Sequence, residues 1–298
     1  MVRALHSCLH FLIVLLGAPL VTGVLNKTKA AMAGRTGAPF LQPYHDLAKL
    51  MRKGFVVSET TTWLFLAGPA LSVAAPVAVL LLLPLGGAPA WISFPGDMVL
   101  FVYLFALSRF FVTTAAMDTG SPFEGMGAAR EVTFSALAEP ALLFGMLALA
   151  RLTGSLSLSR MLDLRAVSGW RGASASLVLV VASWFLVLLA ENARVPFDDP
   201  STHLELTMIH EVMVLDHAGP AFGLILYGSA LKLTVFASLL VTLLLPPHPA
   251  LFAAGLLAVA VAVGLVESSM ARLRLVRVPQ LLITATLLAG FAVVLLLR

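Results

Sequence analysis

Six of the chain's fifteen acidic residues and three of its seven histidines lie between residues 191 and 219. This stretch, ENARVPFDDPSTHLELTMIHEVMVLDHAG, directly follows a long apolar run. Carboxylates and imidazoles exchange protons and also bind metals. The sequence therefore gathers its main store of proton-exchanging groups in one segment beside a hydrophobic one.

A metal site in this stretch is the weaker of two interpretations. His203, His210 and His217 recur every seven residues, so a helix beyond Pro200 would carry them on one face. HEVMV at 210–214 lacks the second histidine of the zinc-binding pattern H-E-x-x-H. We therefore predict a polar helix face directed at water or a partner, and no metal site on this chain.

Two further acids, Glu131 and Glu139, lie at the start of an apolar segment and inside it. They are eight residues apart, which on a helix is about 12 Å in depth and about 80° in direction. Pro140 frees a backbone carbonyl near Glu139. Ionisable groups in the hydrocarbon layer are costly and usually serve a function. A proton path is the favoured interpretation; the alternative is a solvated Glu131 and a structural hydrogen bond at Glu139.

Two basic residues, Arg109 and Lys232, also lie inside apolar segments. Each requires a carboxylate partner or a side chain that reaches the membrane surface. We expect ion pairs within the membrane, although sequence spacing does not identify the partners.

The elements that position these groups are predicted from composition. The chain of 298 residues is 60% hydrophobic and 11% charged, against roughly 25% charged in soluble domains. Apolar runs of about 20 residues cross a bilayer as helices. We predict an all-α polytopic membrane protein, a single integral membrane domain over residues 1–298. Its eight spans are expected near 4–25, 63–85, 98–117, 132–153, 174–190, 221–245, 250–266 and 279–297.

The N-terminal segment and the single cysteine limit the function classes. The first apolar run is long for a signal peptide and no clean A-x-A cleavage site follows it, so a retained helix is favoured over a cleaved signal. Cys8 alone excludes a disulfide framework and a cysteine-ligated zinc or iron–sulfur site on this chain by itself. The net charge of +4 gives no indication of nucleic acid binding.

Orientation follows from the lysines and arginines of the loops. With the N-terminus outside, the inner segments hold eleven of these residues and the outer segments six, which the positive-inside rule favours. Residues 26–62 and the acid-rich loop 191–220 would then be cytoplasmic. Within 26–62, PYHDLAKLMRKG spaces its apolar residues three and four apart, which predicts an amphipathic helix at the membrane interface.

Four motifs in order resemble one known family. They are GRTGAPFLQPYHDLAKLMRKG at 34–54, DTGSPFEGMGAAREVTFSALAEPALL at 118–143, the 191–219 stretch, and ESSMARLRLVRVPQLL at 267–282. Together they resemble the respiratory complex I subunit 1 family, in the version found in formate hydrogenlyase and other group 4 nickel–iron hydrogenases.

The resemblance implies a membrane anchor in a prokaryotic plasma membrane complex. Its expected partners are hydrogenase-like large and small subunits, an iron–sulfur subunit and antiporter-like membrane subunits, together with the lipid bilayer. The nickel–iron site and iron–sulfur clusters would lie on partner subunits, with no cofactor and no catalytic residue on this chain. The implied proton path consists of Glu131, Glu139, Glu191, Glu205, Glu211 and Asp216. The residues implied to dock the hydrophilic arm or line its cavity are Arg35, Arg194, Pro196, Phe197, Asp198, Asp199, His203 and His210.

Two departures separate this chain from the quinone-reducing branch of the family. Asp199 stands where that branch has leucine, and STH at 201–203 replaces EAE. These differences favour the hydrogenase branch and put quinone binding in doubt. Two alternatives stay open: subunit 1 of a quinone-reducing NADH dehydrogenase-like complex, and an independent ion transporter. A lone transporter often shows an internal repeat, and none is evident in the sequence.

Overall fold

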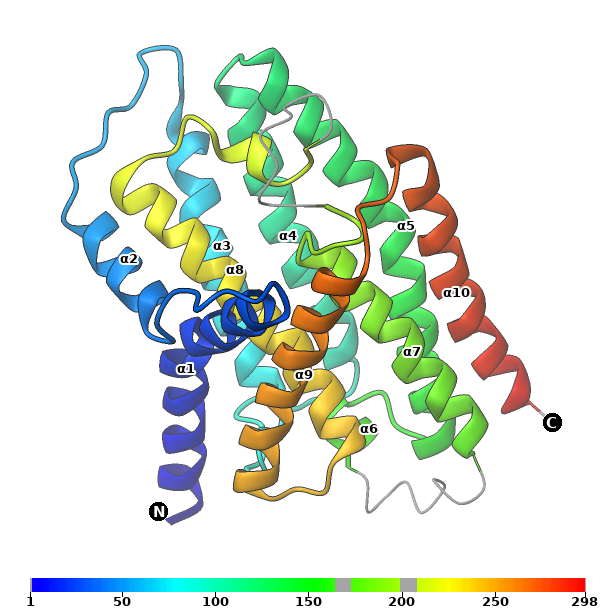
Figure 1. Ribbon diagram of the computed structural model, residues 1–298. Helices are drawn as coiled ribbons and strands as arrows, with labels where there is room; N and C mark the ends of the chain where they lie inside the picture. Colours follow the sequence, from blue (N-terminus) through cyan, green and yellow to red (C-terminus); the bar gives the residue numbers. More distant parts are fainter. Residues whose placement is uncertain (1, 164–172, 199–207, 298) are drawn as a thin grey trace.

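Eight long apolar helices form the protein in the computed structural model, which describes residues 2–163, 173–198 and 208–297 (Figure 1). They are α1 (Val2–Met32), α3 (Trp63–Leu82), α4 (Asp97–Asp118), α5 (Pro122–Thr153), α7 (Ser174–Glu191), α8 (Gly219–Leu244), α9 (Pro249–Ser269) and α10 (Val278–Leu295). Each is long and apolar enough to cross a membrane. The predicted all-α, multi-pass membrane architecture is confirmed.

Two of the spans are longer than predicted. Helix α1 continues to Met32 instead of ending near residue 25, and α5 begins at Pro122 instead of residue 132. Hydropathy marks the part of a helix that lies in hydrocarbon, whereas the backbone hydrogen bonds continue into the polar layer. Glu131 consequently lies more than two turns inside α5, not at its beginning.

Four short helices connect the spans in the described part of the chain. They are α2 (Gln42–Met51), α6 (Leu158–Met161), η2 (Glu211–Val214) and η3 (Leu275–Arg277). Helix α2 is the amphipathic helix expected in the 26–62 segment. It lies against α1 and α8, and none of its residues is buried (Figure 1).

Helix α8 is the central element of the bundle. Of the residues in its most apolar stretch, 72% are buried, which is a larger share than in the other described spans. Glycines allow two pairs of helices to pack closely. Gly228 of α8 lies against the backbone of Ser72 in α3, and Gly145 of α5 lies against the ring of Trp184 in α7. A side chain at either glycine would collide with its neighbour.

The segments predicted to be cytoplasmic gather at one end of the bundle. The α1–α3 connection, the turn between α4 and α5, and the α9–α10 connection all lie at that end (Figure 1). The α7–α8 connection begins and ends there too, at residues 192–198 and 208–218. The start of α1 and the end of α10 both lie towards the opposite side, as an even number of spans requires.

The predicted helix beyond Pro200 is wrong for the residues that the structure describes. From residue 208 the chain forms an irregular segment and the one-turn helix η2 before α8 begins at Gly219. His210 and His217 therefore do not share a helix face. The predictions for Asp199, His203 and Glu205 lie outside the described residues.

Candidate functional site

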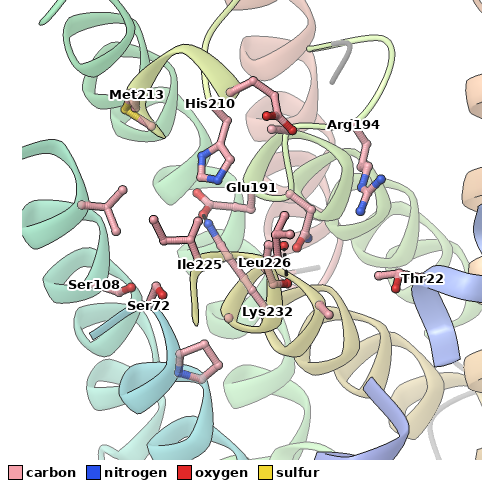
Figure 2. Close-up of a pocket in the computed structure, with 18 of the residues that line it drawn as sticks. Thr22, Ser72, Ser108, Glu191, Arg194, His210, Met213, Ile225, Leu226 and Lys232 are labelled. Carbon is pink, nitrogen blue, oxygen red and sulfur yellow. Dashed lines mark hydrogen bonds and ion pairs between the residues drawn. The ribbon is translucent and has the colours of Figure 1, made fainter. Parts of the chain in front are cut away.

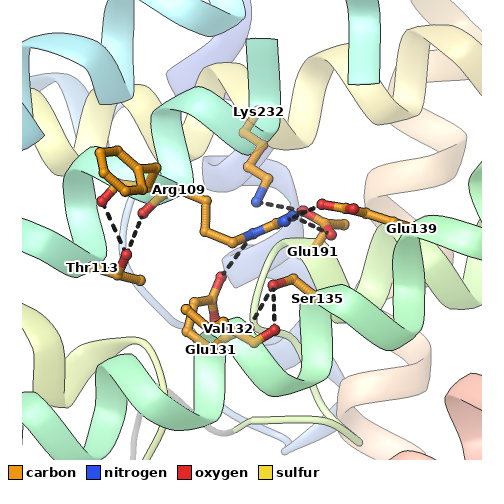
Figure 3. Close-up of polar contacts among 9 residues, drawn as sticks. Arg109, Thr113, Glu131, Val132, Ser135, Glu139, Glu191 and Lys232 are labelled. Carbon is orange, nitrogen blue, oxygen red and sulfur yellow. Dashed lines mark hydrogen bonds and ion pairs between the residues drawn. The ribbon is translucent and has the colours of Figure 1, made fainter. Parts of the chain in front are cut away.

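Arg109 of α4 is at the centre of a group of carboxylates within the membrane-spanning part (Figure 3). One terminal nitrogen donates to Glu139 Oε1 of α5 at 2.6 Å. The other donates to both oxygens of Glu191 at the end of α7, at 2.6 and 2.8 Å. The planar guanidinium suits this task because it offers five donors in a fixed geometry.

Two more charges complete the group. Lys232 of α8 lies 2.8 Å from Glu191 Oε2, and Glu131 of α5 lies 3.9 Å from Arg109 Nε. We call Arg109, Glu131, Glu139, Glu191 and Lys232 the membrane charge cluster. It joins α4, α5, α7 and α8 and contains three carboxylates against two cations.

A cavity of about 350 Å³ is lined by four residues of this cluster and by residues of the α7–α8 connection. Glu191, Arg194, His210 and Lys232 are among the residues that line it (Figure 2). Helix α2 borders it through Pro43, Asp46 and Leu47. The space is large enough for several water molecules and is lined by polar groups that can hold them. Glu191 therefore faces a space that polar groups line.

Asp198 is buried in this chain and organises the loop after α7. Its Oδ2 accepts the backbone N–H groups of Ile209 and His210 at 3.1 and 3.0 Å, and its Oδ1 pairs with Arg272 at 3.0 Å. The carboxylate thus ties the two ends of the α7–α8 connection to the α9–α10 connection. Asp198 therefore holds the loop in position and also lines the cavity; its contact with an arm stays a prediction.

The neighbouring residues Pro196 and Phe197 are also buried. The peptide bond between Val195 and Pro196 is cis. The carbonyl oxygen of Pro196 accepts the N–H of Leu273 at 3.0 Å. Phe197 packs in the main apolar core. Side chains buried in this way hold the loop in shape and leave Arg194, His210 and the exposed Arg35 as the described candidates for contact with an arm.

Glu267 of α9 was not among the predicted site residues, although it begins one of the four family motifs. Its side chain is fully buried, 2.7 Å from Lys29 of α1 and 3.6 Å from Arg194. The available signal was an acid near the end of an apolar helix, which requires a partner. The ion pairs of Glu267 and the Asp198–Arg272 pair together form what we call the loop clamp.

The remaining predicted acids are divided between two places. Glu211 lines the cavity beside His210. Asp216 is exposed, and its backbone N–H donates to the buried Glu124 at 2.9 Å. Asp216 does not line the cavity, so the structure separates it from the membrane charge cluster.

His217 is packed against α3. Its ring stacks on Phe65 with centroids 4.1 Å apart, and Nε2 lies 3.2 Å from the Phe65 carbonyl oxygen. A carbonyl only accepts, so Nε2 carries the proton. Burial lowers the pKa of His217 below its ordinary value. The residue therefore anchors the segment before α8 as a neutral ring.

No group of three or more histidine, cysteine, aspartate or glutamate side chains is arranged to hold a metal ion within residues 2–163, 173–198 and 208–297. The chemistry available among these residues is charge pairing and proton exchange.

Sequence comparison now identifies the family. A family model described as NADH dehydrogenase matches residues 5–298. The chain belongs to the NADH dehydrogenase family. This confirms the resemblance drawn from the four motifs.

Three individual proteins show what kinds of subunit the chain is similar to. The chain is 31% identical to formate hydrogenlyase subunit 4 of Escherichia coli (strain K12), over 93% of each protein. It is 32% identical to hydrogenase-4 component C of the same organism, over 78% of this chain and 73% of that protein. An NADH-quinone oxidoreductase subunit of Rubrobacter xylanophilus is 28% identical over 70% of this chain and 64% of that protein.

A solved structure shares the fold. The chain superimposes with a TM-score of 0.86 on a chain of the membrane-bound sulfane sulfur reductase, an archaeal respiratory membrane complex. The match covers 99% of this chain and 100% of the other at 20% identity. The two chains therefore share their overall fold.

Proposed function

We propose that this chain is the membrane-anchor subunit of a hydrogenase-type oxidoreductase complex. It would dock a soluble arm that carries the nickel–iron site and iron–sulfur clusters, and couple the redox chemistry to proton or cation movement. The full-length match to formate hydrogenlyase subunit 4 supports the hydrogenase branch. The expected neighbours are the large and small hydrogenase subunits, an iron–sulfur subunit and antiporter-like membrane subunits.

One observation supports the coupling role most strongly: the cavity runs from the candidate docking surface to the membrane charge cluster. Arg194 and His210, two candidates for contact with the arm, line the same cavity as Glu191 (Figure 2). A change in charge at the arm would act on Glu191 across a space with weak screening. Glu191 would then release or take up a proton by exchanging its bonds to Arg109 and Lys232.

The same proposal gives the location of the protein. We infer a prokaryotic plasma membrane with the N-terminus outside, because the basic loop residues concentrate at the cavity end of the bundle. That orientation exposes the cavity mouth to the cytoplasm, where a soluble arm would assemble.

A quinone-reducing complex is the second candidate. The identity of 28% to an NADH-quinone oxidoreductase subunit favours it, as does a cavity bordered by the amphipathic helix α2. Purification of the tagged chain from native membranes in mild detergent separates the candidates. Nickel and iron in fixed ratio to the chain are expected. Bound quinone without nickel would favour the second candidate, and a chain with neither partner nor cofactor would indicate a lone transporter.

A further inference from the structure

Glu124 is a buried carboxylate that the proposed proton path does not use. It lies in the first turn of α5, and its exposed fraction is 0%. Its Oε1 accepts the backbone N–H of Asp216 at 2.9 Å, three residues before α8 begins at Gly219. The side chain of Asp216 is exposed, so the backbone alone makes this bond. A buried carboxylate is costly unless it is hydrogen-bonded, and the bond therefore stabilises the carboxylate as well as the segment that it holds.

Two further residues of α5 contact the same segment at regular intervals. A Cβ on Gly127 would lie 2.9 Å from the carbonyl oxygen of Ile209, so the segment passes close to the helix at this point. Arg130 donates to the carbonyl oxygen of Met208 at 2.8 Å. Residues three apart on a helix lie along one side of it. Residues 208–216, which we call the cavity segment, therefore run antiparallel to the first turns of α5.

The cavity segment forms part of the cavity wall. His210, Glu211 and Met213 line the cavity together with Glu131 of α5 (Figure 2). Met213 and Val214 also belong to a small apolar cluster with residues of α4, α5 and α8, which is separate from the main core. The cavity segment can therefore change position while the main core of the bundle stays intact.

We propose that Glu124 is a positioning residue: it fixes the cavity segment through the N–H of Asp216, so that His210 and Glu211 line the cavity beside the membrane charge cluster. This inference rests on the proposed function, because it names a group that holds one wall of the cavity through which the arm would act on Glu191. Without the carboxylate, the segment loses its attachment near α8 and both side chains leave their places in the wall. The role requires a hydrogen-bond acceptor and not a negative charge.

Thiol labelling of the complex, purified from native membranes in mild detergent, reports the position of the segment. Cys8→Ser removes the single cysteine of the chain, and Met213→Cys places a thiol at a site that is 1% exposed. We expect Glu124→Ala to raise the rate of maleimide labelling at residue 213 at least fivefold in monodisperse protein. Glu124→Gln should keep the low rate, since its amide oxygen still accepts. Asp216→Ala is the matched control and should also keep the low rate, because it preserves the backbone donor.

A second variant displaces the segment without removing the carboxylate. Gly127→Ala places a methyl group against the backbone of Ile209, so the segment must shift and labelling at residue 213 should rise here too. Leu215→Cys, at a site that is 53% exposed, should react rapidly in every background and checks the access of the reagent. Val214 is also buried and provides a second labelling site if Met213→Cys does not accumulate.

Ion movement per redox turnover is measured in the same assembled complexes. Glu124→Ala should lower it at least threefold, and Glu124→Gln should restore at least half of the wild-type value. A purely structural role predicts a lower yield of complex, with wild-type labelling and wild-type ion movement in the part that assembles, and this result would overturn the proposal. Equal losses in the alanine and glutamine variants would overturn it as well, because a hydrogen-bond acceptor would then not be what the segment requires.

Retention of the soluble arm keeps the two proposals distinct. If the arm stays bound and residue 213 reacts at the same low rate with and without Glu124, the positioning role is wrong and the anchor function stands. If the wild-type chain retains no other subunit but Glu124→Ala still exposes residue 213, the anchor function fails and Glu124 keeps its positioning role within the chain.

Discussion

Glu191 and Asp198 are both nearly buried carboxylates that pair with basic residues, but their other contacts differ. Asp198 accepts two backbone N–H groups of the following loop in addition to its bond to Arg272. Glu191 bonds to the side chains of Arg109 and Lys232, and both carboxylates line the same cavity. Backbone donors are fixed and cannot titrate, whereas ion pairs between side chains can be exchanged. The contacts of Asp198 hold the loop in its conformation, whereas the ion pairs of Glu191 can rearrange when a proton binds.

The two groups of charged residues to which Asp198 and Glu191 belong differ in the same way. The loop clamp joins α1, α9 and the loops through Glu267 and Asp198. The membrane charge cluster joins α4, α5, α7 and α8 around Arg109 and has an excess carboxylate. A dense group of ionisable residues in the sequence is therefore not a single functional unit. What surrounds each carboxylate decides its role.

The largest effect is expected from Asp198→Ala in the clamp. The substitution leaves the N–H groups of Ile209 and His210 without the carboxylate that accepts them and removes the ion pair with Arg272. Breaking a buried pair costs about 3–5 kcal/mol. We expect loss of monodisperse protein in size-exclusion chromatography. Asp198→Asn should recover part of it, since the amide oxygen still accepts. Exposed Arg274 in the neighbouring connection provides the control, as Arg274→Ala. A stable Asp198→Ala protein defective solely in ion movement would reverse the assignment.

Arg109→Met comes next and tests the membrane charge cluster. It leaves three carboxylates near one lysine, so we expect redox-coupled ion movement to fall at least tenfold per assembled complex. Adding Glu139→Gln removes a carboxylate whose ion pair was with Arg109 and should restore part of the lost thermal stability. Neighbouring groups of this kind couple by about 0.5–3 kcal/mol in a double-mutant cycle. Additive effects on stability would show that the two side chains act separately.

The comparison is sharpest between Glu139→Gln and Glu267→Gln, which make the same chemical change. In the membrane charge cluster the change removes a titratable proton while keeping size and hydrogen bonding. We expect ion movement to fall severalfold there, with assembly and redox activity at the arm near normal. In the clamp we expect reduced assembly with unchanged ion movement per assembled complex. Proton uptake in vesicles, normalised to assembled complex, measures both; the opposite pattern would exchange the two roles.

The smallest effect concerns His217, which is neither in the clamp nor in the cluster. Burial lowers its pKa in the folded chain, so the unfolded chain binds the proton more readily. The free energy of unfolding should therefore fall as pH decreases from above about 6.5, the ordinary histidine value, towards the folded-state pKa. His217→Gln should make melting temperature less dependent on pH between about 7.5 and about 5.5, the range around that value. His248→Gln, at an exposed site, should leave the slope unchanged.

The sequence was sufficient to predict the membrane-spanning helices and the amphipathic helix. The eight spans follow from runs of apolar residues, because crossing about 30 Å of hydrocarbon imposes a requirement on each segment separately. The amphipathic helix α2 follows from local spacing in the same way. The boundaries of α1 and α5 were less accessible, since a helix does not end where its apolar stretch ends.

The sequence predicts which types of residue form the site, but not which of them form ion pairs with one another. The sequence indicates that Arg109 and Lys232 need carboxylate partners, because an isolated charge in hydrocarbon is costly. It does not indicate that Glu139 and Glu191, 30 and 82 residues away along the chain, share the same guanidinium. Helix packing brings them together. The burial of Asp198 and Phe197 was likewise hidden, since their motif reads as a polar, proline-rich loop.

The sequence by itself determined a multi-pass helical membrane protein, its family, and the residues with which it could exchange protons. Those properties depend on local hydrophobicity and on residue identity. The tertiary structure alone decided which carboxylates form ion pairs with side chains and which also accept backbone N–H groups. It also decided which carboxylate of the cluster remains partly exposed. The reason is that the energy of a charge depends on solvent and on partners brought from distant helices. Neither is encoded at a single position.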